Sequence, residues 1–66
     1  MRLTVNGETR EAPDQATLAD LLASLGIDSR RVAVERNLEI APRTQWSAIP
    51  LAEGDRLEIV QFVGGG

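Results

Sequence analysis

The chain has 66 residues, a formal net charge of −3 and a sequence pI near 4.7. It lacks cysteine and histidine, and its seven basic residues are all arginine, which excludes disulfides, thiolate metal sites and the commonest general base. The acidic balance also argues against nucleic-acid binding, which requires a basic face. We therefore expect one small domain that other enzymes act upon, with no catalytic residue, metal or bound cofactor of its own.

The first segment predicts a hairpin. Residues 1–5 (MRLTV) alternate between polar and apolar side chains, as a half-buried strand does. Asn6-Gly7 follows, and this pair favours a type I′ turn because both of its positions need positive φ. The polar residues 8–12 then form a return strand at the edge of a sheet.

A helix is predicted to begin at Thr17. The Thr17 hydroxyl can cap the helix, and Asp20 three residues later resembles a capping box. Gly26 stands where a left-handed residue commonly ends a helix. The expected helix is about nine residues long, on the spacing of its apolar stripe. Four leucines form this stripe and are predicted to be core residues: Leu18, Leu21, Leu22 and Leu25.

The second half of the chain predicts three further strands. Residues 32–36 form a strand, and residues 39–41 form a short one before Pro42. The stretch 43–50 is expected to be a loop or 3₁₀ turn in which Trp46 covers one end of the core. A turn at 53–55 leads to the last and most apolar strand, residues 56–63. Asp55, Arg56 and Glu58 are interpreted as solvated surface.

This order of elements predicts an α+β fold of the β-grasp, or ubiquitin-like, type. A mixed sheet of four or five strands packs on one main helix, and the last strand lies centrally beside the first. The predicted domain spans residues 1–63, and residues 64–66 form a flexible glycine tail.

The last strand is apolar on both sides. Leu57 and Ile59 alternate with Val60 and Phe62, but a sheet that holds one helix has only one covered face. If Leu57 and Ile59 face the helix, Val60 and Phe62 point to solvent and mark an interface. We predict a partner-binding surface of Val60, Phe62 and Val63; a bulge that buries Phe62 is the alternative.

The three terminal glycines are the predicted functional site. Gly64, Gly65 and Gly66 carry no side chain, so they can enter a narrow channel in a partner's active site. The α-carboxylate of Gly66 is the reactive group that this chain can present without a pocket, and it needs activation before a nucleophile can attack it. A frayed terminus is the alternative.

The chain resembles the ThiS family, the small ubiquitin-like sulfur carriers of thiamine biosynthesis. The likeness covers essentially all residues and lies in the stretches LTVNGE, VAVERNLEIAPRTQW and EGDRLEIVQFVGGG. The resemblance implies that a ThiF-like adenylyltransferase uses ATP to adenylate Gly66. A persulfide sulfur donor then forms a thiocarboxylate, from which a ThiG-like thiazole synthase takes sulfur.

Other functions remain open at this point. A molybdopterin-type carrier shares the fold and the Gly-Gly end, a ubiquitin-like binding module would leave the tail unused, and a protein-tagging modifier would share the activation chemistry. An enzyme is least compatible with the side chains present. The sequence shows neither a signal-peptide pattern nor a membrane-spanning apolar run, so we expect a cytoplasmic protein without membrane or nucleic-acid partners.

Overall fold

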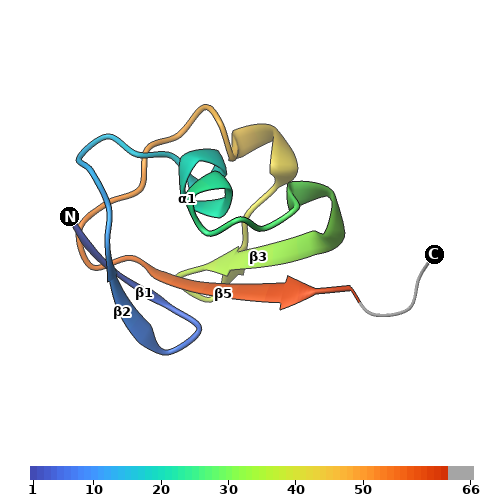
Figure 1. The fold of residues 1–66 in the computed structure, drawn as a ribbon, viewed down its shortest axis with the longest axis horizontal. Coiled ribbons are helices and arrows are strands. Elements are labelled where there is room, and N and C mark those ends of the chain that lie inside the picture. The colour runs from blue at the N-terminus through green and yellow to red at the C-terminus, as the bar shows by residue number, and fades with distance from the viewer. Residues whose placement is uncertain (63–66) are drawn as a thin grey trace.

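A five-stranded mixed sheet packed against one α-helix makes up residues 1–62, the residues that this computed structural model describes (Figure 1). The strands are β1 Arg2–Val5, β2 Glu8–Glu11, β3 Val32–Arg36, β4 Glu39–Ile40 and β5 Arg56–Gln61. The helical segments are α1 Leu18–Ser24 and the 3₁₀ turns η1 Ser29–Arg31 and η2 Arg43–Gln45. The strand order is β2-β1-β5-β3-β4, with β1 and β5 parallel and the other neighbours antiparallel. The predicted β-grasp architecture is confirmed.

The N-terminal hairpin forms as predicted. Asn6 and Gly7 have φ angles of 48° and 82°, which are the two positive values of a type I′ turn. The turn sets Val5 opposite Glu8, so that β1 presents its apolar face to the core while every residue of β2 is exposed. β2 is therefore the polar edge strand that its sequence predicted, although it ends one residue earlier, at Glu11.

Helix α1 is fixed at both ends by local hydrogen bonds. The Thr17 hydroxyl accepts from the Asp20 amide at 3.1 Å, and the Asp20 carboxylate accepts from the Thr17 amide at 2.9 Å, which completes the capping box. At the other end, Gly26 has a φ of 71° and the Ile27 amide donates to the Leu22 carbonyl at 3.0 Å. This Schellman ending limits the helix to seven residues, two fewer than predicted.

The core lies between α1 and one face of the sheet. Three of the four predicted core leucines are buried, and Leu25 packs against the core while partly exposed. Trp46 is buried, and its indole nitrogen donates to the Ala41 carbonyl at 2.8 Å, which confirms its predicted place over the core. The buried apolar cluster comprises Leu3, Val5, Leu18, Leu21, Leu22, Val32, Val34, Trp46, Leu51 and Leu57. Each buried leucine contributes roughly 2 kcal/mol by leaving water.

All helical segments of residues 1–62 lie on the same side of the sheet, which leaves the second face open to solvent (Figure 1). β5 is the central strand, between β1 and β3. It ends at Gln61, short of the predicted Val63, and the predicted boundary between domain and tail lies outside the described residues. No helix in residues 1–62 is long and apolar enough to cross a membrane.

Candidate functional site

The predicted reactive group and its tail lie just beyond the described chain. Gly64, Gly65 and Gly66, together with Val63 of the predicted interface, are outside residues 1–62, so their roles remain predictions. The structure does show the platform from which they extend. The Phe62 amide donates to the Arg31 carbonyl at 2.8 Å, and this bond fixes the end of β5 against the start of β3.

The two faces of β5 divide as predicted. Leu57 is buried and Ile59 packs against the core, whereas Val60 and Phe62 are 58% and 57% exposed. The alternative in which Phe62 is buried is therefore wrong. Because side chains alternate along a strand, Val60 points away from α1, and Phe62 is exposed one residue beyond the end of β5.

Neighbouring strands extend this apolar surface. Val60 pairs with Ala33 of β3, and Glu35 pairs with Ile40 of β4, so these side chains share the open face. Ile40 is 69% exposed. We call the four apolar residues of this face the open-face patch: Ala33, Ile40, Val60 and Phe62. An exposed apolar surface of contiguous strands is typical of a site that binds another protein.

Two carboxylates border the open-face patch. Glu35 of β3 lies directly opposite Glu58 of β5 in the sheet register, so both side chains stand on the open face. Like charges at directly opposed positions destabilise a sheet. A positively charged group from a partner would relieve this repulsion, so the arrangement favours a partner surface that is apolar with a basic residue beside it.

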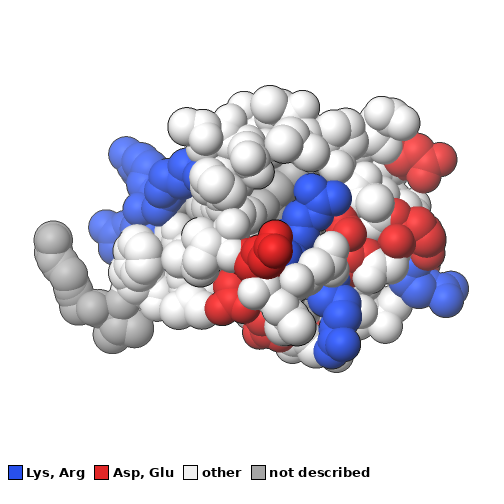
Figure 2. Space-filling model, turned by 180° about the vertical axis from the view of Figure 1, so that it is seen from behind, with Lys and Arg blue, Asp and Glu red and all other residues white. Residues whose placement is uncertain are grey.

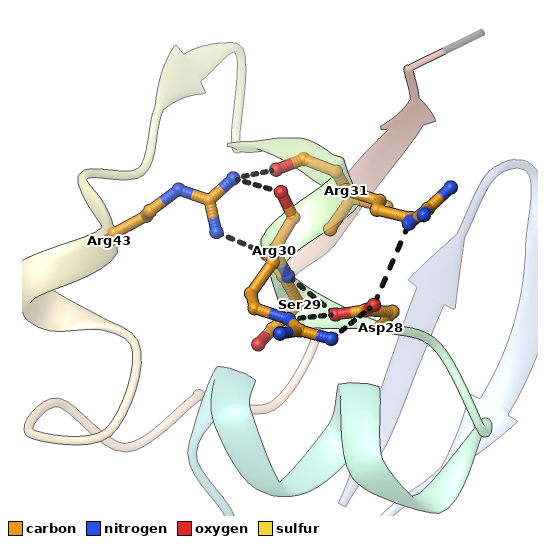
Figure 3. A network of polar contacts seen from close by, with 6 residues as sticks. Asp28, Ser29, Arg30, Arg31 and Arg43 are labelled. Carbon is orange, nitrogen blue, oxygen red and sulfur yellow. Dashed lines mark hydrogen bonds and ion pairs between the residues drawn. The ribbon is translucent and has the colours of Figure 1, made fainter. Parts of the chain in front are cut away.

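Phe62 also borders a groove of about 190 Å³ between β3 and the segment 40–43. This segment is held to β3 by the Ala41 amide, which donates to the Val34 carbonyl at 2.8 Å. Arg43 continues the attachment, since its guanidinium donates to the carbonyls of Ser29 and Val32, the latter at 2.8 Å (Figure 3). The same guanidinium lies 4.8 Å from the centre of the Trp46 ring.

Asp55 corrects the interpretation of its side chain as solvated surface. It is only 5% exposed and anchors the start of β5. The Arg36 guanidinium donates to it at 2.8 and 2.9 Å, the Asn37 amide group at 2.9 Å and the Ala52 backbone amide at 2.8 Å. Burial alone would raise the pKa of Asp55, but the hydrogen bonds from Asn37 and Ala52 and the positive charge of Arg36 together lower that pKa.

Sequence reasoning missed the turn that adjoins the end of β5. Asp28 caps η1 by accepting from the Arg30 amide at 2.9 Å, and its carboxylate also pairs with the side chains of Arg30 and Arg31 (Figure 3). Hydrogen bonds from the Arg30 side chain and backbone lower the pKa of Asp28. An aspartate two residues before a basic pair was the available signal, since aspartate is a favoured capping residue.

Residues 1–62 contain no cluster of carboxylates suited to hold a metal ion. What the described site offers is an exposed apolar sheet face beside the end of β5, with a positively charged turn next to it. Such a domain, with one helix on one face of a mixed sheet and the other face open, is a β-grasp protein of the ubiquitin-like class.

Comparisons with known proteins identify the family within this class. The sequence model of the ThiS family matches residues 3–66. Sulfur carrier protein ThiS of Bacillus subtilis is 42% identical over 65 residues, which span 97% of this chain and 98% of that protein. The crystal structure of a thiamine biosynthesis protein (ThiS) from Geobacter metallireducens superposes with a TM-score of 0.84 at 33% identity and covers all of both chains. The chain therefore belongs to the ThiS family.

A second group of relatives is longer. A thiazole synthase of Paramagnetospirillum magneticum is 52% identical over 66 residues, and one of Magnetococcus marinus is 42% identical over 66 residues. These residues are the whole of this chain but 20% of each relative, so the chain spans about a fifth of the length of the thiazole synthases that it matches.

Proposed function

We propose that this chain is a sulfur carrier protein of thiamine biosynthesis and that the α-carboxylate of Gly66 is the group that carries the sulfur. Membership of the ThiS family carries this proposal, because the family match runs to the final glycine at residue 66. The composition supports it as well. Residues 1–66 contain no cysteine, histidine, lysine or tyrosine, so the proposed chemistry uses none of these side chains as the sulfur-carrying group.

The proposed chemistry takes place in partner enzymes. The Gly66 carboxylate attacks the α-phosphorus of ATP held by a ThiF-like adenylyltransferase, and pyrophosphate leaves. The terminal sulfur of a persulfide donor then attacks the acyl carbon and displaces AMP. A second thiol cleaves the resulting acyl disulfide, so the carrier is left with a thiocarboxylate and the two thiols are oxidised to a disulfide. The carrier is a co-substrate, and ATP is bound by the partner.

A ThiG-like thiazole synthase is the proposed acceptor of the sulfur. Support comes from relatives named thiazole synthase that contain a segment similar to this whole chain within one polypeptide. A carrier domain joined to a synthase indicates that the two act on each other. Because activation consumes ATP, we place the carrier in the cytoplasm.

The open-face patch is the proposed docking surface for these partners. Val60 and Phe62 expose more than half of their surface at the end of β5, and Val63, outside the described residues, is the third residue predicted for this surface. Glycines can follow a narrow channel that excludes other side chains. The patch would hold the domain at the entrance while the tail reaches the active site.

Intact-mass spectrometry tests the proposal. The chain is incubated with the adenylyltransferase of its own organism, ATP and a persulfide donor. We expect the mass to rise by the difference between sulfur and oxygen, and fragmentation to place the change on Gly66. The spectrum of the untreated chain shows whether Gly66 bears the free carboxylate, and a chain that continues past Gly66 would contradict the proposal.

A variant that lacks Gly65 and Gly66 is the matched control. It should fold, since the last strand of the sheet ends at Gln61, but it should gain no sulfur. Retention of function by this variant would instead support a binding module with an unused tail. Capture of thiazole synthase rather than a molybdopterin synthase large subunit separates the two carrier types.

A further inference from the structure

A positively charged corner adjoins the point where β5 ends. The Arg31 carbonyl accepts the hydrogen bond from the Phe62 amide, so η1 and the last described residue are direct neighbours. The side chains of Arg30 and Arg31 are 87% and 73% exposed. In space-filling view, positive side chains gather at this end of the molecule, whereas charges of both signs mix elsewhere on the same face (Figure 2). The corner is positive in a chain whose formal net charge is −3.

The contacts of the corner compensate this positive charge only in part, because one carboxylate faces three guanidinium groups. Asp28 pairs with both exposed arginines, at 3.1 Å to the Arg30 Nε and 3.7 Å to the Arg31 Nε. Arg43 adds a third guanidinium, which donates to backbone carbonyls (Figure 3). Each of these ion pairs draws on the same carboxylate, that of Asp28. Exposed ion pairs contribute little to stability, so fold stability does not explain two adjacent exposed arginines.

We propose that Arg30 and Arg31 dock the carrier onto an acidic rim around the active-site entrance of its adenylating partner. This inference rests on the proposed function. Complementary surface charges accelerate the encounter of two proteins and set their orientation. A corner fixed to the base of the tail is placed to aim the tail at the channel, since it moves with the end of β5.

The length of residues 63–66 indicates that Arg30 and Arg31 contact the partner's protein surface and not the bound nucleotide. Residues 63–66 can carry the terminal carboxylate up to about 13 Å beyond Phe62, at roughly 3.3 Å per residue. Arg30 and Arg31 are attached beside Phe62, at the start of this span. When the tail is inserted, these arginines therefore remain at the entrance of the channel, where the partner presents its surface.

The test measures association rates with the purified adenylyltransferase of the same organism. Arg30→Gln/Arg31→Gln is compared with Arg2→Gln/Arg10→Gln, which removes the same charge from the β1–β2 hairpin at the opposite end of β5. At low salt we expect about tenfold slower association for the first variant and less than twofold change for the second. The difference should shrink at about 150 mM salt. Equal rates for the two variants would overturn the inference.

Asp28→Asn is a second test, in which the association rate should change in the opposite direction. Asparagine keeps the oxygen that caps η1 but removes the negative charge between the arginines. We expect faster association at low salt than in the unaltered chain. If the corner merely stabilised the turn, Asp28→Asn would leave the rate unchanged or slow it, and the inference would fail.

Steady-state kinetics of pyrophosphate release distinguish a role of the two arginines at the partner's rim from a role at the nucleotide. With Arg30→Gln/Arg31→Gln we expect a higher KM for the carrier, an unchanged KM for ATP and a kcat within about twofold of the unaltered value. A higher KM for ATP would show that the arginines act on the nucleotide, contrary to the inference. Failure of the unaltered chain to be adenylated removes the proposed function and the inference together. If the unaltered chain is adenylated but Arg30→Gln/Arg31→Gln associates as fast as the unaltered chain, only the inference fails.

Discussion

Asp55 carries a charge that the fold buries at the start of β5. A buried carboxylate is unstable unless charged or polar groups replace the water that it loses. Arg36, Asn37 and the Ala52 amide do so, and they belong to β3, the β3–β4 turn and the turn before β5. The side chain therefore ties three segments together around one carboxylate.

Asp55→Asn should lower the free energy of unfolding by about 2–3 kcal/mol at neutral pH, because hydrogen bonds to a buried charge are lost and Arg36 loses its partner. The folded-state pKa of Asp55 is lowered. Its contribution is thus complete above the unfolded value of about 3.9 and is lost as pH falls through the lower folded value. Urea titrations across this acid range should show the variant and the unaltered chain converging. Glu8→Gln, on the exposed edge strand, is the control and should change stability little. A difference that stays constant into strong acid would contradict this account.

Leu38 occupies a backbone conformation that suits glycine. Its φ is 71° and its side chain is 91% exposed, so the strain of the left-handed region is not offset by burial. Leu38→Gly should raise the free energy of unfolding by up to about 1 kcal/mol, measured by thermal unfolding. Asn37→Gly is the matched control, because Asn37 has a φ of 51° but bonds Asp55 and the Arg56 amide. Asn37→Gly should therefore lower the free energy of unfolding. A loss of stability in Leu38→Gly would refute the strain argument.

Elements whose signals are local could be predicted from the sequence. The Asn6-Gly7 turn, the Thr17 cap and the Gly26 ending each depend on residues within one or two turns of chain, and all three formed as expected. The exposure of Val60 and Phe62 followed from strand parity once one covered face was assumed. These parts of the fold and of the candidate site needed no knowledge of distant partners.

Features that depend on distant partners escaped prediction. Asn6 forms the hairpin turn but also accepts from the Ile59 amide at 2.7 Å, 53 residues away, where it prolongs the contact of β1 with β5. The partners of Asp55 on β3 and in the turn after β3 are 19 and 18 residues distant, respectively. Arg43 donates to the Ser29 carbonyl in the turn that precedes β3 and to the Val32 carbonyl of β3. Such contacts exist only after the sheet has assembled, so the sequence pattern marked Asp55 as surface and showed no distant partner for Asn6 or Arg43.

The capping box of α1 should make a measurable contribution to the free energy of unfolding. Thr17→Ala removes the hydroxyl that accepts from the Asp20 amide. It should cost about 1 kcal/mol of unfolding free energy, the usual value for a lost cap. Thr44→Ala, at an exposed position in η2, is the control and should change stability by less than about 0.5 kcal/mol in the same urea titration. Equal effects of the two changes would contradict the role of the cap.

At the scale of the molecule, the fold places the core on one face of the sheet and the residues of the proposed docking surface on the other. A chain of this size has a small stability margin, because it buries only about 60% of the surface that its unfolded form exposes. Its helix-side residues are committed to the core, among them Leu57 at 1% exposure. The open face carries Val60 and Phe62, which contribute little to that core and are available to a partner.

Phe62→Asp tests this division. Because 57% of Phe62 is exposed, the variant should keep its free energy of unfolding within about 1 kcal/mol. Loss of an exposed aromatic anchor from a docking surface should weaken binding to the adenylyltransferase at least tenfold, measured by calorimetry or surface plasmon resonance. Leu38→Asp is the control, since it places the same charge on an exposed apolar residue in the β3–β4 turn, away from the end of β5. Its affinity should match that of the unaltered chain. Equal losses of affinity would mean that added negative charge, and not the open-face patch, governs the association. Unfolding of Phe62→Asp alone would mean that Phe62 supports the core despite its exposure.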